Sequence, residues 1–206
     1  MDLTVIQKDA LTELINIGYG RAAGALSELT GYRITLEVPR VGMHDISEIA
    51  PMLESVIQGE VASVNQVFSG PIGGHALLLL DEEAALMLSQ LFADERAPVR
   101  GFDASAREVI TEIGNILLNA CLGVFGNLLR VQVSFAVPRL HVESVSHILE
   151  SITLGTDEKL QYGLMIHTRF HLRSSKITGY LVIILGIVSL DRLLRELENW
   201  ENRQTQ

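Results

Sequence analysis

The sequence carries the same pattern twice, ninety-nine residues apart, and this duplication is the feature that most limits how the chain can fold. Residues 9–16, DALTELIN, return as residues 108–115, EVITEIGN, and in each copy twenty-two residues separate the asparagine from a proline, Pro39 or Pro138. Over the forty-one positions that start at these two places, eleven are identical without a gap, where unrelated segments would share about two or three. Two copies are too few for a solenoid, so the pattern predicts two half-domains related by a pseudo-twofold axis.

Length and composition restrict the class of protein. With 206 residues, 48% of them hydrophobic, the chain can build a substantial core. The longest strongly apolar stretch, 180–190, is about half of the roughly twenty residues that a bilayer span needs, so we expect a buried strand and no membrane insertion. The first residues lack the features of a secretory signal, and the lone Cys121 can form no internal disulfide; both favour a cytoplasmic location. A net charge of −9 without a Lys/Arg cluster argues against nucleic acid as a partner.

Each copy begins with a predicted helix followed by a strand. The first helix starts at a capping box of Thr4 and Gln7 and ends near Gly31, and its apolar positions recur every three or four residues. From residue 32 the apolar positions alternate, which predicts a strand over 32–38 that Pro39 closes. The second copy repeats this order in phase, with a capping box of Ser105 and Glu108 and an alternating strand over 131–137.

The remaining segments complete the two halves. Strands are predicted over 60–68, 74–80, 160–172 and 177–185, and helices over 81–92 and 188–200. Ile72-Gly-Gly aligns with Ile177-Thr-Gly if the second copy has six extra residues, so the duplication covers nearly the whole chain. We therefore predict one α+β domain of two repeats, 1–93 and 104–206, joined by a polar connector, 94–103. The helix-strands-helix halves are expected to share one mainly antiparallel sheet, with the helices packed on it.

A polar face recurs on the first helix of each repeat. Asp9, Glu13 and Asn16 are spaced i, i+4 and i+7, so they lie along one side of a helix, and Glu108, Glu112 and Asn115 have the same spacing. A solvated helix face is the ordinary explanation of such a triplet, and the capping box would explain Glu108 alone. However, asparagine is a mediocre helix-interior residue, and Glu and Asn are unchanged in a repeat where most polar positions differ.

The residues near these faces exclude several kinds of chemistry. No Ser/His/Asp or Cys/His arrangement accompanies them, and Cys121 falls on the apolar side of its helix, where a buried, inert thiol is expected. Each face offers one strong metal ligand, and the six histidines lack metal-binding spacing, so no metal or other cofactor of its own is expected. What remains is a carboxylate that can pair with a lysine and an amide that can bind a water, acting on a reactive centre in another protein.

At these residues the chain resembles the CheC/CheX/FliY family of chemotaxis phosphatases. The family signature is Asp or Ser, three residues, Glu, two residues, Asn, twenty-two residues and Pro. The first copy, from Asp9 through Glu13 and Asn16 to Pro39, matches it fully, and the second departs only in having Glu108 at the first position. The resemblance extends over essentially the whole chain.

The resemblance implies a phosphatase that acts on the aspartyl-phosphate of the response regulator CheY, in whose active site a Mg²⁺ ion is expected. It implies that Asn16 or Asn115 enters that site and aligns the attacking water, while Glu13 or Glu112 binds a conserved lysine of CheY. Asp9 and Glu108 would contact the partner beside them. The family also suggests the receptor deamidase CheD as a second partner.

Two other functions stay open at the level of sequence. The chain could be a non-enzymatic adaptor that sequesters phosphorylated CheY or regulates CheD, because the related FliM-type switch domains share the architecture without the Glu/Asn pairs. It could also be a metal-dependent hydrolase, for which the sequence offers few ligands. The retention of both Glu/Asn pairs favours the phosphatase, and both copies are candidate sites, with the first preferred because it matches the signature more closely.

Overall fold

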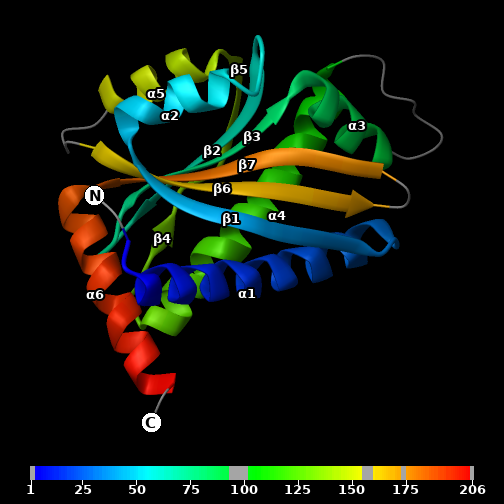
Figure 1. Cartoon of the computed structure of the whole chain (residues 1–206). Coiled ribbons are helices and arrows are strands. Elements are labelled where there is room, and N and C mark those ends of the chain that lie inside the picture. Colours follow the sequence, from blue (N-terminus) through cyan, green and yellow to red (C-terminus); the bar gives the residue numbers. More distant parts are fainter. Residues whose placement is uncertain (1–2, 93–101, 155–159, 173–174, 205–206) are drawn as a thin grey trace.

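The computed structural model describes residues 3–92, 102–154, 160–172 and 175–204, which form a sheet between two layers of helices (Figure 1). Along the chain the elements are α1 (Val5–Thr30), β1 (Ile34–Asp45), α2 (Ile46–Glu54), β2 (Val61–Ser69), β3 (Gly74–Asp81), α3 (Glu82–Phe92), α4 (Ala104–Leu129), β4 (Ser134–Phe135), β5 (Arg139–Glu143), α5 (Val145–Leu154), β6 (Leu160–Leu172), β7 (Ser175–Gly186) and α6 (Ile187–Gln204). The α+β class predicted from the sequence is confirmed.

Within the described residues the sheet has seven strands, and every pairing among them is antiparallel. Its order is β1-β6-β7-β3-β2-β4, with β5 also paired to β2. The last strand of each half, β3 or β7, thus lies at the centre, the strand before it comes next, and the strand that follows the long helix forms the edge. This is the order that two halves related by a twofold axis would adopt.

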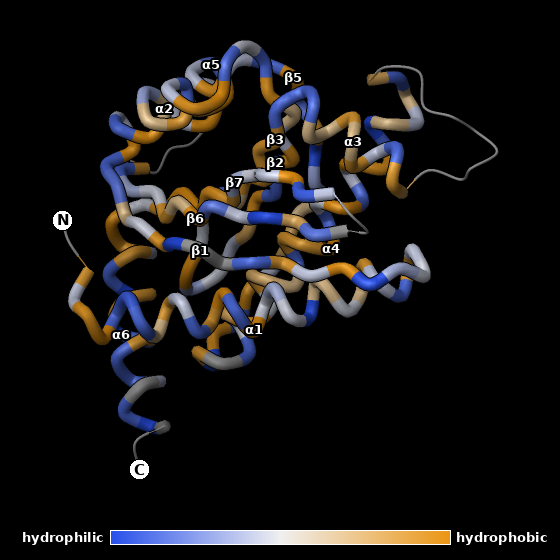
Figure 2. Tube along the Cα trace, turned by 45° about the vertical axis from the view of Figure 1, so that its right-hand side comes forward, coloured by the Kyte–Doolittle hydropathy of each residue, from blue (hydrophilic) through white to orange (hydrophobic). Residues whose placement is uncertain are grey.

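Helices cover both faces of the sheet. The long helices α1 and α4 pack against each other and, with α6, cover one face, while the short helices α2 and α5 cover part of the other (Figure 1). The central strand β3 serves both cores, because Leu78 and Leu80 point to the long helices and Leu77 and Leu79 to the short ones. Hydrophobic residues accordingly gather on β2, β3 and α4, and the end of α6 is hydrophilic (Figure 2).

Helix α4 is unusually apolar. Over Ala104–Asn127 it is long and apolar enough to cross a bilayer by those two criteria alone, and 50% of its most apolar window is buried in this fold. Its core side chains pack between α1 and the sheet, which accounts for the composition without a membrane. The apolar stretch 180–190 forms the end of β7, as expected, and the start of α6.

Several sequence-based predictions about individual elements are wrong. Pro39 does not close its strand, because β1 continues to Asp45 after a register shift between Glu37 and Arg40. The strand predicted over 131–137 shrinks to the two residues of β4, and the pattern did not predict α2 and α5. The alternation of apolar and polar residues over 131–137 predicted too long a strand, because this segment lies at the sheet edge, where Val137 is 84% exposed. Most of the predicted connector, 94–101, lies outside the described residues.

Candidate functional site

The first candidate site is one exposed face of α1, formed by Asp9, Glu13 and Asn16, which we call the first face. All three side chains are exposed, whereas the opposite side of the helix is buried. The capping box predicted at Thr4 and Gln7 is present, with the Gln7 N–H donating to Thr4 Oγ1 at 3.2 Å and the Thr4 N–H to Gln7 Oε1 at 3.0 Å. The cap fixes where the helix begins.

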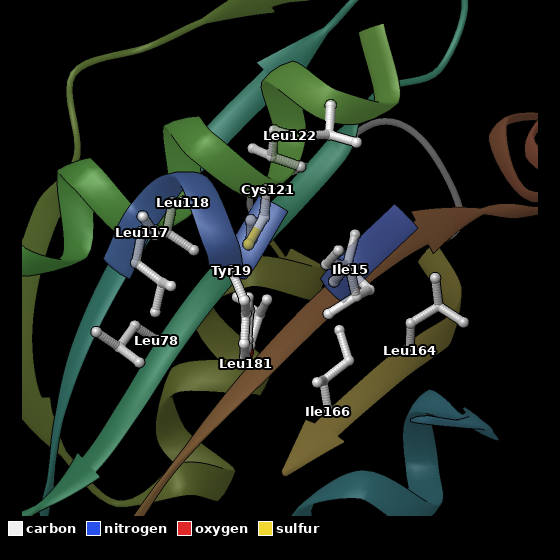
Figure 3. Close-up of a cluster of buried hydrophobic side chains, with 14 of the residues drawn as sticks. Ile15, Tyr19, Leu78, Leu117, Leu118, Cys121, Leu122, Leu164, Ile166 and Leu181 are labelled. Atoms are coloured by element: carbon white, nitrogen blue, oxygen red, sulfur yellow. The ribbon is translucent and has the colours of Figure 1, made fainter. Parts of the chain in front are cut away.

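Two buried contacts hold α1 in its rotation about the helix axis. The hydroxyl of Tyr19 is hydrogen-bonded to Thr168 Oγ1 of β6, and burial raises the pKa of Tyr19 well above its ordinary value. Next to it, Gly18 lies against Cys121 of α4, so that the two helices approach closely, and Tyr19 and Cys121 lie side by side in the core (Figure 3). With Gly18 and Tyr19 held against the core, the helix cannot turn about its axis, and Asn16 stays exposed beside the buried side.

The second candidate site is the equivalent face of α4, formed by Glu108, Glu112 and Asn115, which we call the second face. Glu108 and Glu112 are exposed, but Asn115 is half-buried. The predicted capping box at Ser105 and Glu108 is wrong: α4 begins at Ala104, and Asp103 is its N-cap, accepting the Ala106 N–H at 2.9 Å. Capping therefore does not explain Glu108, which lies exposed on the second face as Asp9 does on the first.

A chain of side-chain amides restrains Asn115. Asn119 Nδ2 donates to Asn115 Oδ1 at 2.6 Å, and Gln66 Nε2 of β2 donates to Asn119 Oδ1 at 3.0 Å and to the Ala136 carbonyl at 3.1 Å. We call these three amides the Gln66 relay. Sequence reasoning missed it, although Asn119 lies four residues after Asn115, where the first copy has Gly20. Among the described residues, no side chain holds the amide of Asn16 in this way.

A cleft of about 680 Å³ lies beside the first face, at the edge of the sheet. Lys8 and Thr12 of α1 line one side of it, and Thr12 Oγ1 donates to the Lys8 carbonyl at 2.7 Å. Arg40 and His167 lie on adjacent strands of its wall, and the wall contains no Asp or Glu among the described residues. The positive charge of Lys8 and Arg40 therefore borders the carboxylates of the first face.

The two faces are suited to binding and orienting rather than to chemistry of their own. Cys121 is fully buried, and burial raises the pKa of its thiol far above the ordinary value, so it stays protonated. No group of three His, Cys, Asp or Glu side chains in the described part of the chain could hold a metal ion. What each face does present is an exposed carboxylate for a cation and an amide that can hydrogen-bond to a water.

Comparison with known proteins finds similarity to CheC-like proteins. Residues 6–43, which include the whole first face, match the model of the CheC-like family. The CheY-P phosphatase CheC of Bacillus subtilis is 22% identical over 165 residues, or 79% of this chain and 78% of that protein.

Solved structures share the fold. FliY of Thermotoga maritima has a TM-score of 0.76 at 18% identity and covers 99% of this chain and 100% of its own. The FliM middle domain of Helicobacter pylori has a TM-score of 0.66 at 13% identity, with coverages of 94% and 99%. A CheX-CheY-BeF3-Mg²⁺ complex from Borrelia burgdorferi has a TM-score of 0.51 at 16% identity, with coverages of 82% and 96%.

Proposed function

Because this chain belongs to the CheC/CheX/FliY family, we propose that it is a chemotaxis phosphatase that removes the aspartyl-phosphate of the response regulator CheY. The observation that carries the proposal is the exposure of Glu13 and Asn16 on one face of a helix whose other side is locked into the core. A rigid helix with an outward carboxylate and amide one turn apart can enter a shallow pocket of another protein without rearranging.

In the proposed mechanism the first face docks on CheY over its phosphorylated aspartate. Glu13 pairs with a lysine of CheY and so fixes the position of the helix, while Asp9 contacts the partner one turn earlier. Asn16 enters the active site and hydrogen-bonds to a water, which attacks phosphorus in line with the bond to the aspartate. The water oxygen bonds to phosphorus, the aspartate oxygen leaves as a carboxylate, and the proton of the water passes to the released phosphate.

This mechanism needs no acid or base with an unusual pKa. Phosphoryl transfer depends mostly on the position of the nucleophile and on stabilising charge at the phosphoryl oxygens. The charge is handled by groups of CheY, where we expect the Mg²⁺ ion, and the phosphatase contributes the oriented water. In the second face, Glu112 and Asn115 would have the same roles, with Glu108 in the place of Asp9.

The test is a turnover assay with phosphorylated CheY from the same organism in at least tenfold excess. The wild-type protein should accelerate phosphate loss through many turnovers, Asn16→Ala and Asn115→Ala should each keep part of the rate, and the double variant should lose the acceleration. Asn127→Ala is the matched control, because Asn127 is exposed on α4 outside both faces. A double variant as fast as the wild type would refute the proposal.

The alternative function is a non-enzymatic adaptor that sequesters phosphorylated CheY or regulates the deamidase CheD. The fold shared with the FliM middle domain favours this alternative. A shared fold does not depend on the Glu/Asn pairs that a phosphatase would need. In the same assay an adaptor would protect or bind at most one CheY per face and would show no turnover. Either function, with CheY as the partner, places the protein in the cytoplasm.

A further inference from the structure

We infer that Asn119 restrains the second site, so that most of the turnover comes from the first. This inference rests on the proposed function and concerns how the two sites differ. The difference comes from the Gln66 relay, which has no counterpart at Asn16: the position equivalent to Asn119 is Gly20, where an added β-carbon would meet nothing within 4 Å.

The Ala136 carbonyl, at the buried end of the Gln66 relay, determines which way each amide group points. The Ala136 carbonyl can only accept, so the NH₂ group of Gln66 must face it, and the same NH₂ group donates to Asn119 Oδ1. Asn119 therefore presents its own NH₂ group to Asn115 and occupies Asn115 Oδ1 through a bond of 2.6 Å. Gln66 is only 1% exposed, so the orientation of all three amides is set from inside the fold.

The orientation of the Asn115 amide matters because the reaction needs one particular atom of it. A water attacks phosphorus through a lone pair on its oxygen, so the group that orients it should accept one of its hydrogens and leave that lone pair free. The acceptor of an asparagine side chain is Oδ1. In the second face, Asn119 occupies Asn115 Oδ1, so the NH₂ group of Asn115 is left to face the partner. If this NH₂ group donated a hydrogen bond to the water, it would occupy the lone pair that has to attack phosphorus.

The first face has no such restraint. Asn16 is exposed, and within the described part of the chain its Oδ1 accepts no side-chain hydrogen bond, so it can turn toward a water when the helix docks. Asn115 must first release Asn119, and the net strength of one hydrogen bond corresponds to a rate difference of about two- to tenfold. Asn119 acts through Asn115 and is in this sense a positioning residue, not a catalytic one.

The experiment isolates each site in the whole protein. Asn16→Ala leaves the second site alone, and adding Asn119→Ala to it should raise kcat about two- to tenfold. The KM should change little, because Glu112 is untouched. The matched control adds Asn119→Ala to Asn115→Ala, in which only the first site works, and kcat should stay the same. Asn115→Ala should also keep more of the wild-type rate than Asn16→Ala does.

The outcomes separate this inference from the proposed function. If the wild type accelerates phosphate loss but Asn119→Ala leaves kcat of the second site unchanged or lower, the inference is wrong and the phosphatase stands. If the wild type shows no acceleration, both fail. Thermal unfolding of each variant checks folding, and a readout without turnover is the solvent exchange of side-chain amide hydrogens, which should be slower for Asn119 than for Asn16. Equal exchange would also overturn the inference.

Discussion

Gly18 of α1 lies directly against the backbone of Cys121 in α4: a β-carbon added to Gly18 would come within 2.9 Å of Cys121 Cα. The two long helices can pack at this distance only because one of them has no side chain at the contact. Since α1 carries the first face and α4 the second, this contact also sets how the two faces are placed relative to each other.

Gly18→Ala should destabilise the protein by about 1–2 kcal/mol, because overpacking against a backbone atom outweighs the gain of about 1 kcal/mol in helix propensity. Gly20→Ala is the matched control on the same helix. It has open space around the added carbon and should stabilise by up to about 1 kcal/mol. Urea unfolding of both variants measures the difference, and a stabilised Gly18→Ala protein would contradict the close contact.

Gly114 makes a similar contact between α4 and the sheet. A β-carbon there would lie 2.6 Å from Val64 Cγ1, and Val64 is fully buried. Gly114→Ala alone should therefore cost about 2 kcal/mol of unfolding free energy, and Val64→Ala alone about as much through its cavity. In the double variant the new methyl group fills part of that cavity, so the loss should be smaller than the sum of the two. Additive losses would count against the contact.

His75 should make the stability depend on pH. It is buried in β3, and burial lowers the pKa of its imidazole below the ordinary value of 6.5. Below about pH 6.5 the unfolded chain binds a proton that the folded chain does not, so the free energy of unfolding should fall as the pH falls from 6.5 toward the folded pKa. Urea unfolding at pH 7.5, 6.5 and 5.5 should show this loss, to which His167, whose pKa is also lowered, contributes.

His75→Gln should reduce that pH dependence, because glutamine can still donate to Asn65 Oδ1, which lies 3.3 Å from His75 Nδ1, but does not titrate. The exposed His141 provides the control, and His141→Gln should keep the wild-type slope. An unchanged slope in the His75→Gln protein would show that its burial does not affect stability in this way.

Glu13→Gln should weaken docking of the partner rather than slow the chemistry. In the Asn115→Ala background, where only the first site works, we expect KM for phosphorylated CheY to rise about tenfold with little change in kcat, because one charged hydrogen bond is lost. The salt dependence of kcat/KM should weaken as well. Glu28→Gln, at an exposed position on the same helix, is the control. A fall in kcat at constant KM would assign Glu13 a different role.

The alignment of the two repeats agrees with the strand pairing at the centre of the sheet. Ile72 and Ile177, aligned by sequence, differ by 105 in number, and so do Leu77 and Val182, which lie directly opposite each other where β3 pairs with β7. The bounds of β6 and the end of α1 at Gly31 also agree with prediction. These features could be predicted because local periodicity and glycine chemistry determine them.

Features that depend on distant contacts could not be predicted. Gln66 and Asn119 are 53 residues apart, and only the fold brings them to the Ala136 carbonyl. Leu29 fits the apolar spacing of α1 but is 60% exposed, because it lies in the last turn of the helix. The short helix α2 contains Pro51. Because proline usually interrupts a helix, the sequence pattern did not predict a helix there.

The two prolines of the repeated spacing lie at the two open borders of the sheet, Pro39 within β1 and Pro138 between β4 and β5. At Pro39 the ladder of β1 shifts, and no run of it is longer than the six residues from Arg40 to Asp45; Pro138 separates β4 from β5. A proline nitrogen has no hydrogen to give to a neighbouring chain. The border strands therefore offer a second molecule only short, broken stretches of free backbone, which opposes growth of the sheet into fibres.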